Sequence, residues 1–270
     1  MSEHDVEHSF EKVPPGLRGL VKRGLRTLGF DLIRHPSRQS LQWQLQLLFA
    51  KLGINCVLDV GANYGQYAHM LRSLGFAGDI ISFEPIPTVF EALRRSMGAD
   101  PRWRGYNLAL GDADGTAAIN VSGGDAQASS LLAFNEEGPA RWGDAHRVVR
   151  TETIQIRRLD GLLDEVTRHV REPRIFLKLD TQGYDLKVVA GAGAQLERVL
   201  ALQTEISVHH YYSGMPAFGQ AIDRYHQLGF GVAGFFPISR EFDGLRVIEF
   251  DTVFVRAPRS GSSGPDAPPS

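Results

Sequence analysis

Residues 57–67 read VLDVGANYGQY and combine an apolar run, one acid and two glycines. The apolar residues around Asp59 predict a buried strand, and the residues from Gln66 onward predict a helix. Gly61 and Gly65 lie in the turn between them, where a glycine lets the backbone approach a ligand closely. A strand followed by a glycine turn and a helix N-terminus indicates a nucleotide-like ligand.

The same alternation of strand and helix continues along the chain. Apolar runs predict further strands at 79–85, 103–111, 174–180 and 200–207, and helical patterns lie between several of them. Residues 116–122 and 151–159 alternate apolar and polar side chains, which is typical of half-exposed antiparallel or edge strands. Segments 230–236 and 247–255 complete the set. We therefore predict an α/β fold with a doubly wound, Rossmann-like, mostly parallel sheet and an antiparallel C-terminal strand.

We expect three parts in the chain. Residues 1–54 form an N-terminal helical extension, residues 55–257 form the main domain, and residues 258–270 form a disordered tail without apolar anchors. The helices of the extension are also a candidate homodimer interface.

Composition limits the partners and the compartment. The formal net charge of −2 and the pI near 6.5 predict no binding to nucleic acid. No apolar run is long enough for a membrane span, and the polar N-terminus is not a secretory signal. The single cysteine, Cys56, cannot form an internal disulfide, which fits a cytoplasmic location.

Polar residues at three successive strand ends indicate the cofactor. The first turn has the pattern D-x-G-x-N-x-G, with Asn63 where a dinucleotide fingerprint has its middle glycine. Asp59 would repel a pyrophosphate but suits an ammonium group, so S-adenosylmethionine, which carries an ammonium and a sulfonium, is favoured over NAD. Glu84 ends the second strand, where an acid can accept both ribose hydroxyls. Leu110 and Asp112 follow the third strand and suit an adenine ring. A NAD-dependent oxidoreductase and a non-catalytic binding protein stay as alternatives.

Together, the segments DVGANYGQY, FEPIP, ALGDADG, ASSLL and FLKLDTQGYDLKVVAGA resemble the FkbM family of S-adenosylmethionine-dependent methyltransferases over residues 56–255. The resemblance implies O-methylation of a sugar hydroxyl in polysaccharide or glycolipid synthesis, and more narrowly a mycobacterial-type enzyme acting on the anomeric hydroxyl of a mannoside. It also assigns the binding residues. The methionine moiety would lie against Asp59, Gly61, Asn63 and Gly65, the ribose against Glu84, and the adenine against Leu110 and Asp112.

Candidate catalytic residues lie at the ends of two later strands. Asp180 and Glu205 end strands predicted to be neighbours, so their carboxylates are expected to converge on the acceptor or on one Mg²⁺ ion. Lys178 is a further catalytic candidate, and a structural ion pair is its alternative. Asp180 also fits a helix cap. His209 and its neighbour His210 face opposite sides of an extended segment, so at most one is catalytic.

The remaining candidates would contact a carbohydrate acceptor. They are Gln182, His210, Tyr211 and Tyr212. Gln182 stands where the resembling family commonly has glutamate in D-x-E-G, and an amide is neither a base nor a strong metal ligand. We therefore expect Glu205 to be the better candidate for the base.

Overall fold

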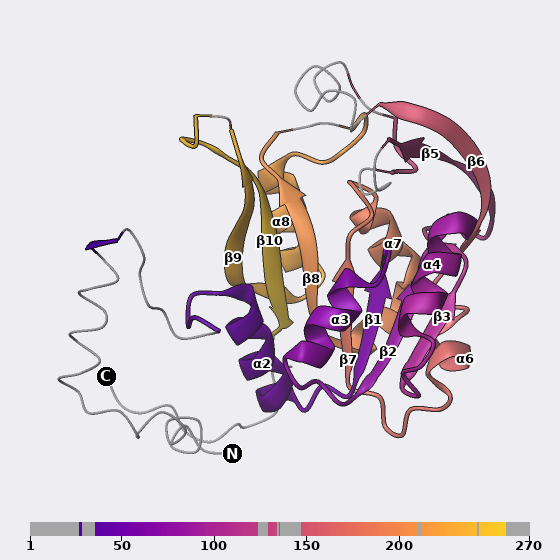
Figure 1. Ribbon diagram of the computed structural model, residues 1–270, viewed down its shortest axis with the longest axis horizontal. Helices are drawn as coiled ribbons and strands as arrows, with labels where there is room; N and C mark the ends of the chain where they lie inside the picture. The colour runs from indigo at the N-terminus through magenta and orange to yellow at the C-terminus, as the bar shows by residue number, and fades with distance from the viewer. Residues whose placement is uncertain are drawn as a thin grey trace. The chain divides into compact units, whose positions relative to one another are not determined.

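A computed structural model describes residues 27–28, 36–123, 129–133, 135, 147–209, 212–241 and 243–257. Its main sheet has seven strands in the order β3-β2-β1-β7-β8-β10-β9 (Figure 1). These strands are β1 (Cys56–Val60), β2 (Asp79–Phe83), β3 (Trp103–Tyr106), β7 (Ile175–Leu179), β8 (Val199–Ser207), β9 (Phe230–Arg240) and β10 (Val247–Arg256).

Strand direction confirms the predicted fold class. β1 pairs in parallel with β2 and β7, β2 with β3, and β7 with β8. β10 is antiparallel to both β8 and β9. The strand order reverses between β1 and β7, and in such sheets ligands bind beyond the carboxyl ends of the strands at this point.

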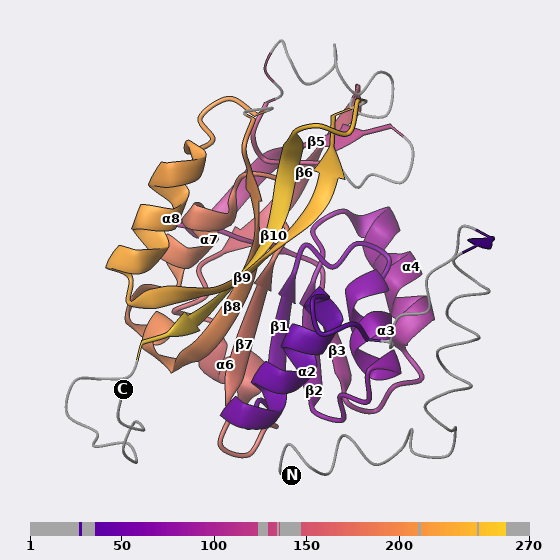
Figure 2. The same cartoon turned by 90° about the vertical axis from the view of Figure 1, so that its left-hand side faces the viewer.

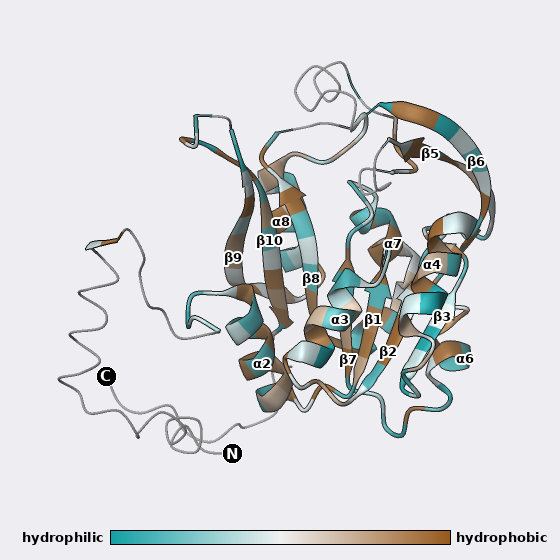
Figure 3. Ribbon diagram, viewed as in Figure 1, coloured by the Kyte–Doolittle hydropathy of each residue, from teal (hydrophilic) through white to brown (hydrophobic). Residues whose placement is uncertain are grey.

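Helices cover both faces of the sheet. Figure 2 shows α3 (Gln66–Ser73) and α4 (Pro87–Met97) on one side, with α7 (Asp185–Gly191) and α8 (Phe218–Gln227) on the other. All residues of β1, β2 and β7 are buried between them. The short helix α6 (Leu163–Thr167) and the 3-10 turn η3 (Gly193–Arg198) belong to the β6–β7 and β7–β8 connections. Figure 3 shows hydrophobic and hydrophilic residues alternating along the helices, as expected where one side packs on the sheet.

Segment 103–111 is not one strand, and the prediction of a single third strand is wrong. It divides into β3 and β4 (Ala109–Leu110), which belong to different sheets. The side-chain amide of Asn107 donates to the carbonyl oxygens of Glu84 and Pro85, at 2.8 and 3.0 Å, and so holds the chain between the two strands. The residues of this segment favour strands throughout, so the sequence pattern gives no sign of the turn between β3 and β4.

The second sheet has three strands in the order β4-β6-β5. β5 (Gly115–Ser122) and β6 (Val148–Arg157) pair antiparallel and are partly exposed, which confirms the reading of their alternating patterns. β4 adds to β6 in parallel, so this sheet continues from the carboxyl end of the main one.

The chain divides into two compact units, residues 1–43 and residues 44–270. The helix α2 (Leu41–Leu52) extends into the second unit, where Phe49 packs edge-on against Phe76 and Phe176 of the main domain. This packing begins before the boundary predicted at residue 54. The predicted tail, residues 258–270, lies outside the described residues. No helix in the described part of the chain is long and apolar enough to cross a membrane.

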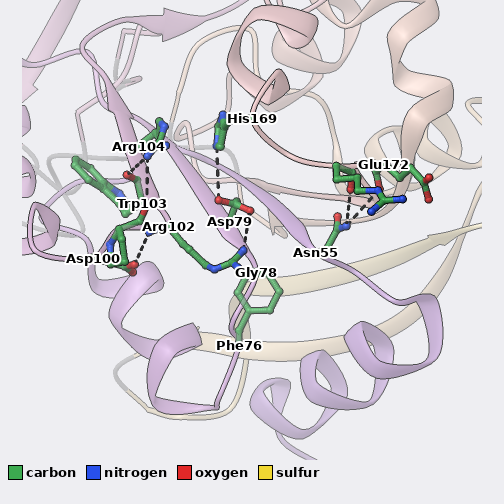
Figure 4. A network of polar contacts seen from close by, with 12 residues as sticks. Asn55, Phe76, Gly78, Asp79, Asp100, Arg102, Trp103, Arg104, His169 and Glu172 are labelled. Atoms are coloured by element: carbon green, nitrogen blue, oxygen red, sulfur yellow. Dashed lines mark hydrogen bonds and ion pairs between the residues drawn. The ribbon is translucent and has the colours of Figure 1, made fainter.

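A polar network holds the amino ends of the strands, away from the predicted site (Figure 4). Asp79, the first residue of β2, pairs with Arg102 at 3.3 Å and lies 3.7 Å from His169. The side-chain amide of Asn55 donates to the carbonyl oxygens of Arg171 and Glu172, both at 3.3 Å. The network therefore lies at the opposite edge of the sheet from the carboxyl ends, where sheets of this kind bind ligands.

Candidate active site

The backbone of the turn after β1 lies very close to the end of β7. Gly61 has a φ of +75°, and a Cβ atom there would lie 1.9 Å from the carbonyl oxygen of Asp180. The backbone N–H groups of Gly61 and Ala62 both donate to the carbonyl oxygen of Phe83, at 3.0 and 3.1 Å. A side chain at position 61 would clash with the end of β7, so only glycine fits there. The turn therefore lies against β7 on one side and is hydrogen-bonded to β2 on the other.

Every backbone N–H group of this turn has an acceptor inside the protein. Beyond Ala62, the N–H of Asn63 donates to Glu84 and that of Tyr64 to the Asn63 side chain, at 2.9 and 2.8 Å. The N–H of Gly65 donates to the carbonyl oxygen of Ala62 at 2.9 Å. A turn that binds pyrophosphate directs free N–H groups at the ligand. This turn does not.

Glu84 is buried at the end of β2, with 4% of its surface exposed. Its two carboxylate oxygens accept the N–H groups of Asn63 and Ile86, each at 2.9 Å. Burial raises the pKa of Glu84 to about 7, although these two hydrogen bonds oppose the shift. Each oxygen keeps a second lone pair, so the carboxylate can still accept a pair of hydroxyl groups.

Asp59 lies completely out of solvent and is paired with Lys178. The Lys178 Nζ atom lies 3.2 Å from Asp59 Oδ1 and 3.2 Å from Asp180 Oδ2, and it donates to the carbonyl oxygen of Gly61 at 3.1 Å. The hydroxyl of Ser82, a residue that the sequence analysis missed, donates to Asp59 Oδ2. Lys178 thus forms the ion pair that was its structural alternative, and a catalytic role for it stays a prediction. The role of Asp59 beside a cofactor stays a prediction, but its charge is compensated within the protein.

Two residues predicted to contact the adenine lie in β4 and in the turn after it. Asp112 pairs with Lys187 at 2.7 Å, and this hydrogen bond holds the pKa of Asp112 below its usual range. The hydroxyl of Tyr184, a residue absent from the sequence prediction, donates to Asp112 at 3.4 Å. Leu110 is only 1% exposed, because it belongs to the main hydrophobic core. Contact of Leu110 or Asp112 with a base stays a prediction.

Asp180 and Glu205 come together at the ends of β7 and β8, as the strand order predicted. Gln182 lies between them, and its Nε2 atom donates to Asp180 Oδ1 at 2.9 Å and to Glu205 Oε2 at 3.0 Å. Burial raises the pKa of Glu205 well above its usual value, and neighbouring carboxylates, Asp180 first, raise it further. This carboxylate therefore holds a proton more readily than one in water.

Sequence reasoning missed two further acids on the adjacent strand. Asp251 of β10 is the direct register partner of Glu205, and Glu249 lies two residues away on the same strand. Gln203 donates to Asp251 at 2.7 Å, and burial raises the pKa of Asp251 to about 6. The period-two spacing of the two acids was the only signal in the sequence, because their approach to Glu205 depends on antiparallel pairing.

The residues predicted to contact the acceptor, and His209 beside them, lie in different surroundings. Tyr212 is buried and its hydroxyl donates to Gln182 Oε1 at 3.0 Å. His209 lies 3.6 Å from Glu241 beyond the end of β9. His210 and Tyr211 lie outside the described residues. A small cavity next to Glu205 is bordered by Gly183, Ser207 and Met215.

A family model described as the methyltransferase FkbM domain matches residues 59–232. The chain belongs to the FkbM methyltransferase family. The match contains every described candidate residue from the glycine turn through Tyr212, so the expectation drawn from the resemblance is confirmed at the level of the family.

The individual proteins to which the chain is similar have low sequence identity to it. The chain is 28% identical to 2-O-methyltransferase NoeI of Sinorhizobium fredii over 162 residues, which cover 58% of this chain and 65% of that protein. The match thus spans just under two thirds of the relative's length. A TehB-like methyltransferase of Corynebacterium glutamicum superposes with a TM-score of 0.37 at 13% identity, covering 90% of this chain and 97% of that one. Magnesium protoporphyrin IX methyltransferase of Synechocystis superposes with a TM-score of 0.41 at 9% identity, covering 80% and 79%.

Proposed function

We propose that the protein transfers a methyl group from S-adenosylmethionine to a hydroxyl group of a carbohydrate acceptor. The single observation that carries the choice of cofactor is the internal use of every N–H group from Gly61 to Gly65. A pyrophosphate needs such donors, whereas S-adenosylmethionine has no phosphate. This supports a methyl donor over NAD, in agreement with the family.

The residues present fit this cofactor. The close backbone turn at Gly61, Asn63 and Gly65 would border the methionine moiety, and Glu84 would accept the ribose hydroxyls with its remaining lone pairs. Asp112 and Tyr184 would lie toward the adenine. S-adenosylmethionine supplies an electrophilic methyl group on a sulfonium centre.

Glu205 is our candidate for the general base. A sugar hydroxyl is a weak nucleophile at neutral pH, so its proton must leave as the new carbon–oxygen bond forms. A carboxylate with a raised pKa takes up that proton more readily than an ordinary glutamate. Asp180 has its Oδ2 atom held by Lys178 and is better suited to orient the acceptor.

The acceptor class rests on two supports. One relative is a 2-O-methyltransferase by name, which favours an oxygen acceptor. The carboxylates of Asp180 and Glu205, at the ends of β7 and β8, can accept hydrogen bonds from sugar hydroxyls. The anomeric hydroxyl of a mannoside is the narrower hypothesis, and other hydroxyl positions are its competitors.

Calorimetric titration tests the cofactor first. We expect S-adenosylhomocysteine to bind and NAD not to bind, and tighter binding of NAD would refute the proposal. Incubation with labelled S-adenosylmethionine and a panel of free and methylated mannosides and glucosides then tests the acceptor. Binding without turnover on any acceptor would favour the alternative of a non-catalytic binding protein.

A further inference from the structure

Gln182 joins the two strand ends that carry the candidate acids. Its single Nε2 atom has two hydrogens, and one reaches Asp180 Oδ1 at 2.9 Å while the other reaches Glu205 Oε2 at 3.0 Å. The Oε1 atom of the same amide accepts the hydroxyl of Tyr212 at 3.0 Å. The opposite amide orientation would place the carbonyl oxygen against two carboxylates, so only this orientation satisfies the network.

The backbone holds this side chain in place. Gln182 has a φ of +54°, followed by Gly183 at +90°. A non-glycine residue in this region is uncommon and persists where the surrounding structure holds it. The hydroxyl of Ser130 donates to the Gln182 carbonyl oxygen at 2.8 Å, and Ser130 itself bridges to Asn120 of β5. Both sheets therefore fix the amide between the acids.

A divalent metal ion does not fit this arrangement. Mg²⁺ takes oxygen ligands, but the position between Asp180 and Glu205 receives the N–H donors of Gln182. The ammonium group of Lys178 adds a positive charge 3.2 Å from Asp180 Oδ2. Across the described part of the chain, no three His, Cys, Asp or Glu side chains are grouped as metal ligands.

We propose that Gln182 is a positioning residue that takes the place of a divalent cation between Asp180 and Glu205. Its amide holds one oxygen of each carboxylate and directs Glu205 Oε1, which makes no hydrogen bond to any described residue, toward the acceptor hydroxyl. The proposal rests on the proposed function for the identity of that acceptor. It replaces the prediction of a magnesium site at these two acids.

Substitution of Gln182 by glutamate tests the proposal directly, because it changes two N–H donors into a third carboxylate at nearly the same shape. We expect the wild-type protein to show no Mn²⁺ binding in a calorimetric titration and the Gln182→Glu variant to bind Mn²⁺. Methyl transfer by the wild type should be unchanged by a chelator, and transfer by the variant should depend on added divalent ion.

Two further variants separate positioning from folding and from charge. Gln182→Met keeps the length but removes the hydrogen bonds, and it should lower kcat on the order of a hundredfold with the affinity for S-adenosylhomocysteine unchanged. Gln227→Glu adds the same charge on the exposed end of α8 and should alter neither Mn²⁺ binding nor kcat.

Binding of Mn²⁺ by the wild-type protein at these acids, or a Gln182→Glu variant identical to wild type in Mn²⁺ binding, would overturn the proposal. An unchanged kcat in Gln182→Met would overturn it as well. The Mn²⁺ titration needs no acceptor. If no variant methylates any acceptor while the Mn²⁺ results are as expected, the failure belongs to the proposed function and the geometry of Gln182 is supported.

Discussion

The Nζ atom of Lys178 lies 3.2 Å from Oδ1 of Asp59, and both side chains are almost completely buried. Burial by itself would lower the pKa of Lys178, but Asp180, Asp59 and Glu205 raise it overall. The lysine is therefore charged in the folded protein and compensates the first acid of the glycine turn. This pair joins the ends of β1 and β7, on the two sides of the point where the strand order reverses.

Substitution of Lys178 by methionine should destabilise the protein by about 3–5 kcal/mol, because it leaves Asp59 buried without its partner. Urea unfolding of the protein measures the loss. The double variant Lys178→Met with Asp59→Asn should lose less than the sum of the two single changes. Additive losses would show that the two groups do not interact.

Affinity for S-adenosylhomocysteine should rise between about pH 6 and about pH 8 by up to about tenfold, if the charged form of Glu84 binds the ribose. Burial raises the pKa of Glu84 to about 7, so the carboxylate is mostly protonated below this pH and mostly charged above it. Calorimetry at several pH values measures the change. In a Glu84→Gln variant, affinity should be lower and its dependence on pH should disappear.

Glu205→Gln should reduce kcat on the order of a hundredfold or more, because an amide cannot accept the proton of the acceptor hydroxyl. The affinity for S-adenosylhomocysteine should stay the same, since Glu205 lies on β8 and not at the glycine turn. Glu249→Gln is the control on the same sheet face, where Ser207 holds the carboxylate at 2.7 Å. It should retain most of the turnover. Equal losses in the two variants would contradict the assignment of Glu205 as base.

Gly61→Ala should destabilise the protein by more than about 4 kcal/mol, because the new Cβ atom would lie 1.9 Å from a carbonyl oxygen. Gly75→Ala is a matched control. Gly75 has a similar φ of +85°, but a Cβ atom there meets nothing within 4 Å. Only backbone strain of about 1–2 kcal/mol is expected there. Thermal unfolding of both variants measures the difference.

Thr252→Val should leave stability within about 1 kcal/mol of the wild type or increase it, because the Thr252 hydroxyl is buried and has no hydrogen-bond partner among the described residues. Its register partner Thr204 provides the contrast. Thr204 donates to Asp185 at 2.6 Å and accepts from Tyr225 at 3.3 Å. Thr204→Val should therefore cost about 1–3 kcal/mol in a urea titration. A larger loss at position 252 than at 204 would contradict this assignment of hydrogen bonds.

The sequence predicted the strand ends that carry the candidate site but not the contacts between their side chains. Asp180 and Glu205 were expected together because parallel neighbouring strands end at one edge. Nothing local indicated that Gln182 would lie between them, since its position depends on Ser130 and Tyr212, which are distant in the chain. Asp251 was missed for the same reason, because antiparallel pairing of β10 with β8 brings it beside Glu205.

The sequence by itself determined the buried strands, the glycine turn and the order of the elements, because apolar runs and the conformational freedom of glycine act over a few residues. Only the tertiary structure decided how segment 103–111 divides, which partner compensates Asp59 and what occupies the space between the two acids. These outcomes depend on contacts between distant residues, such as the 117 positions that separate Lys178 from Gly61. The charge and donor balance at the candidate site is therefore a property of the packed strands and not of any single motif.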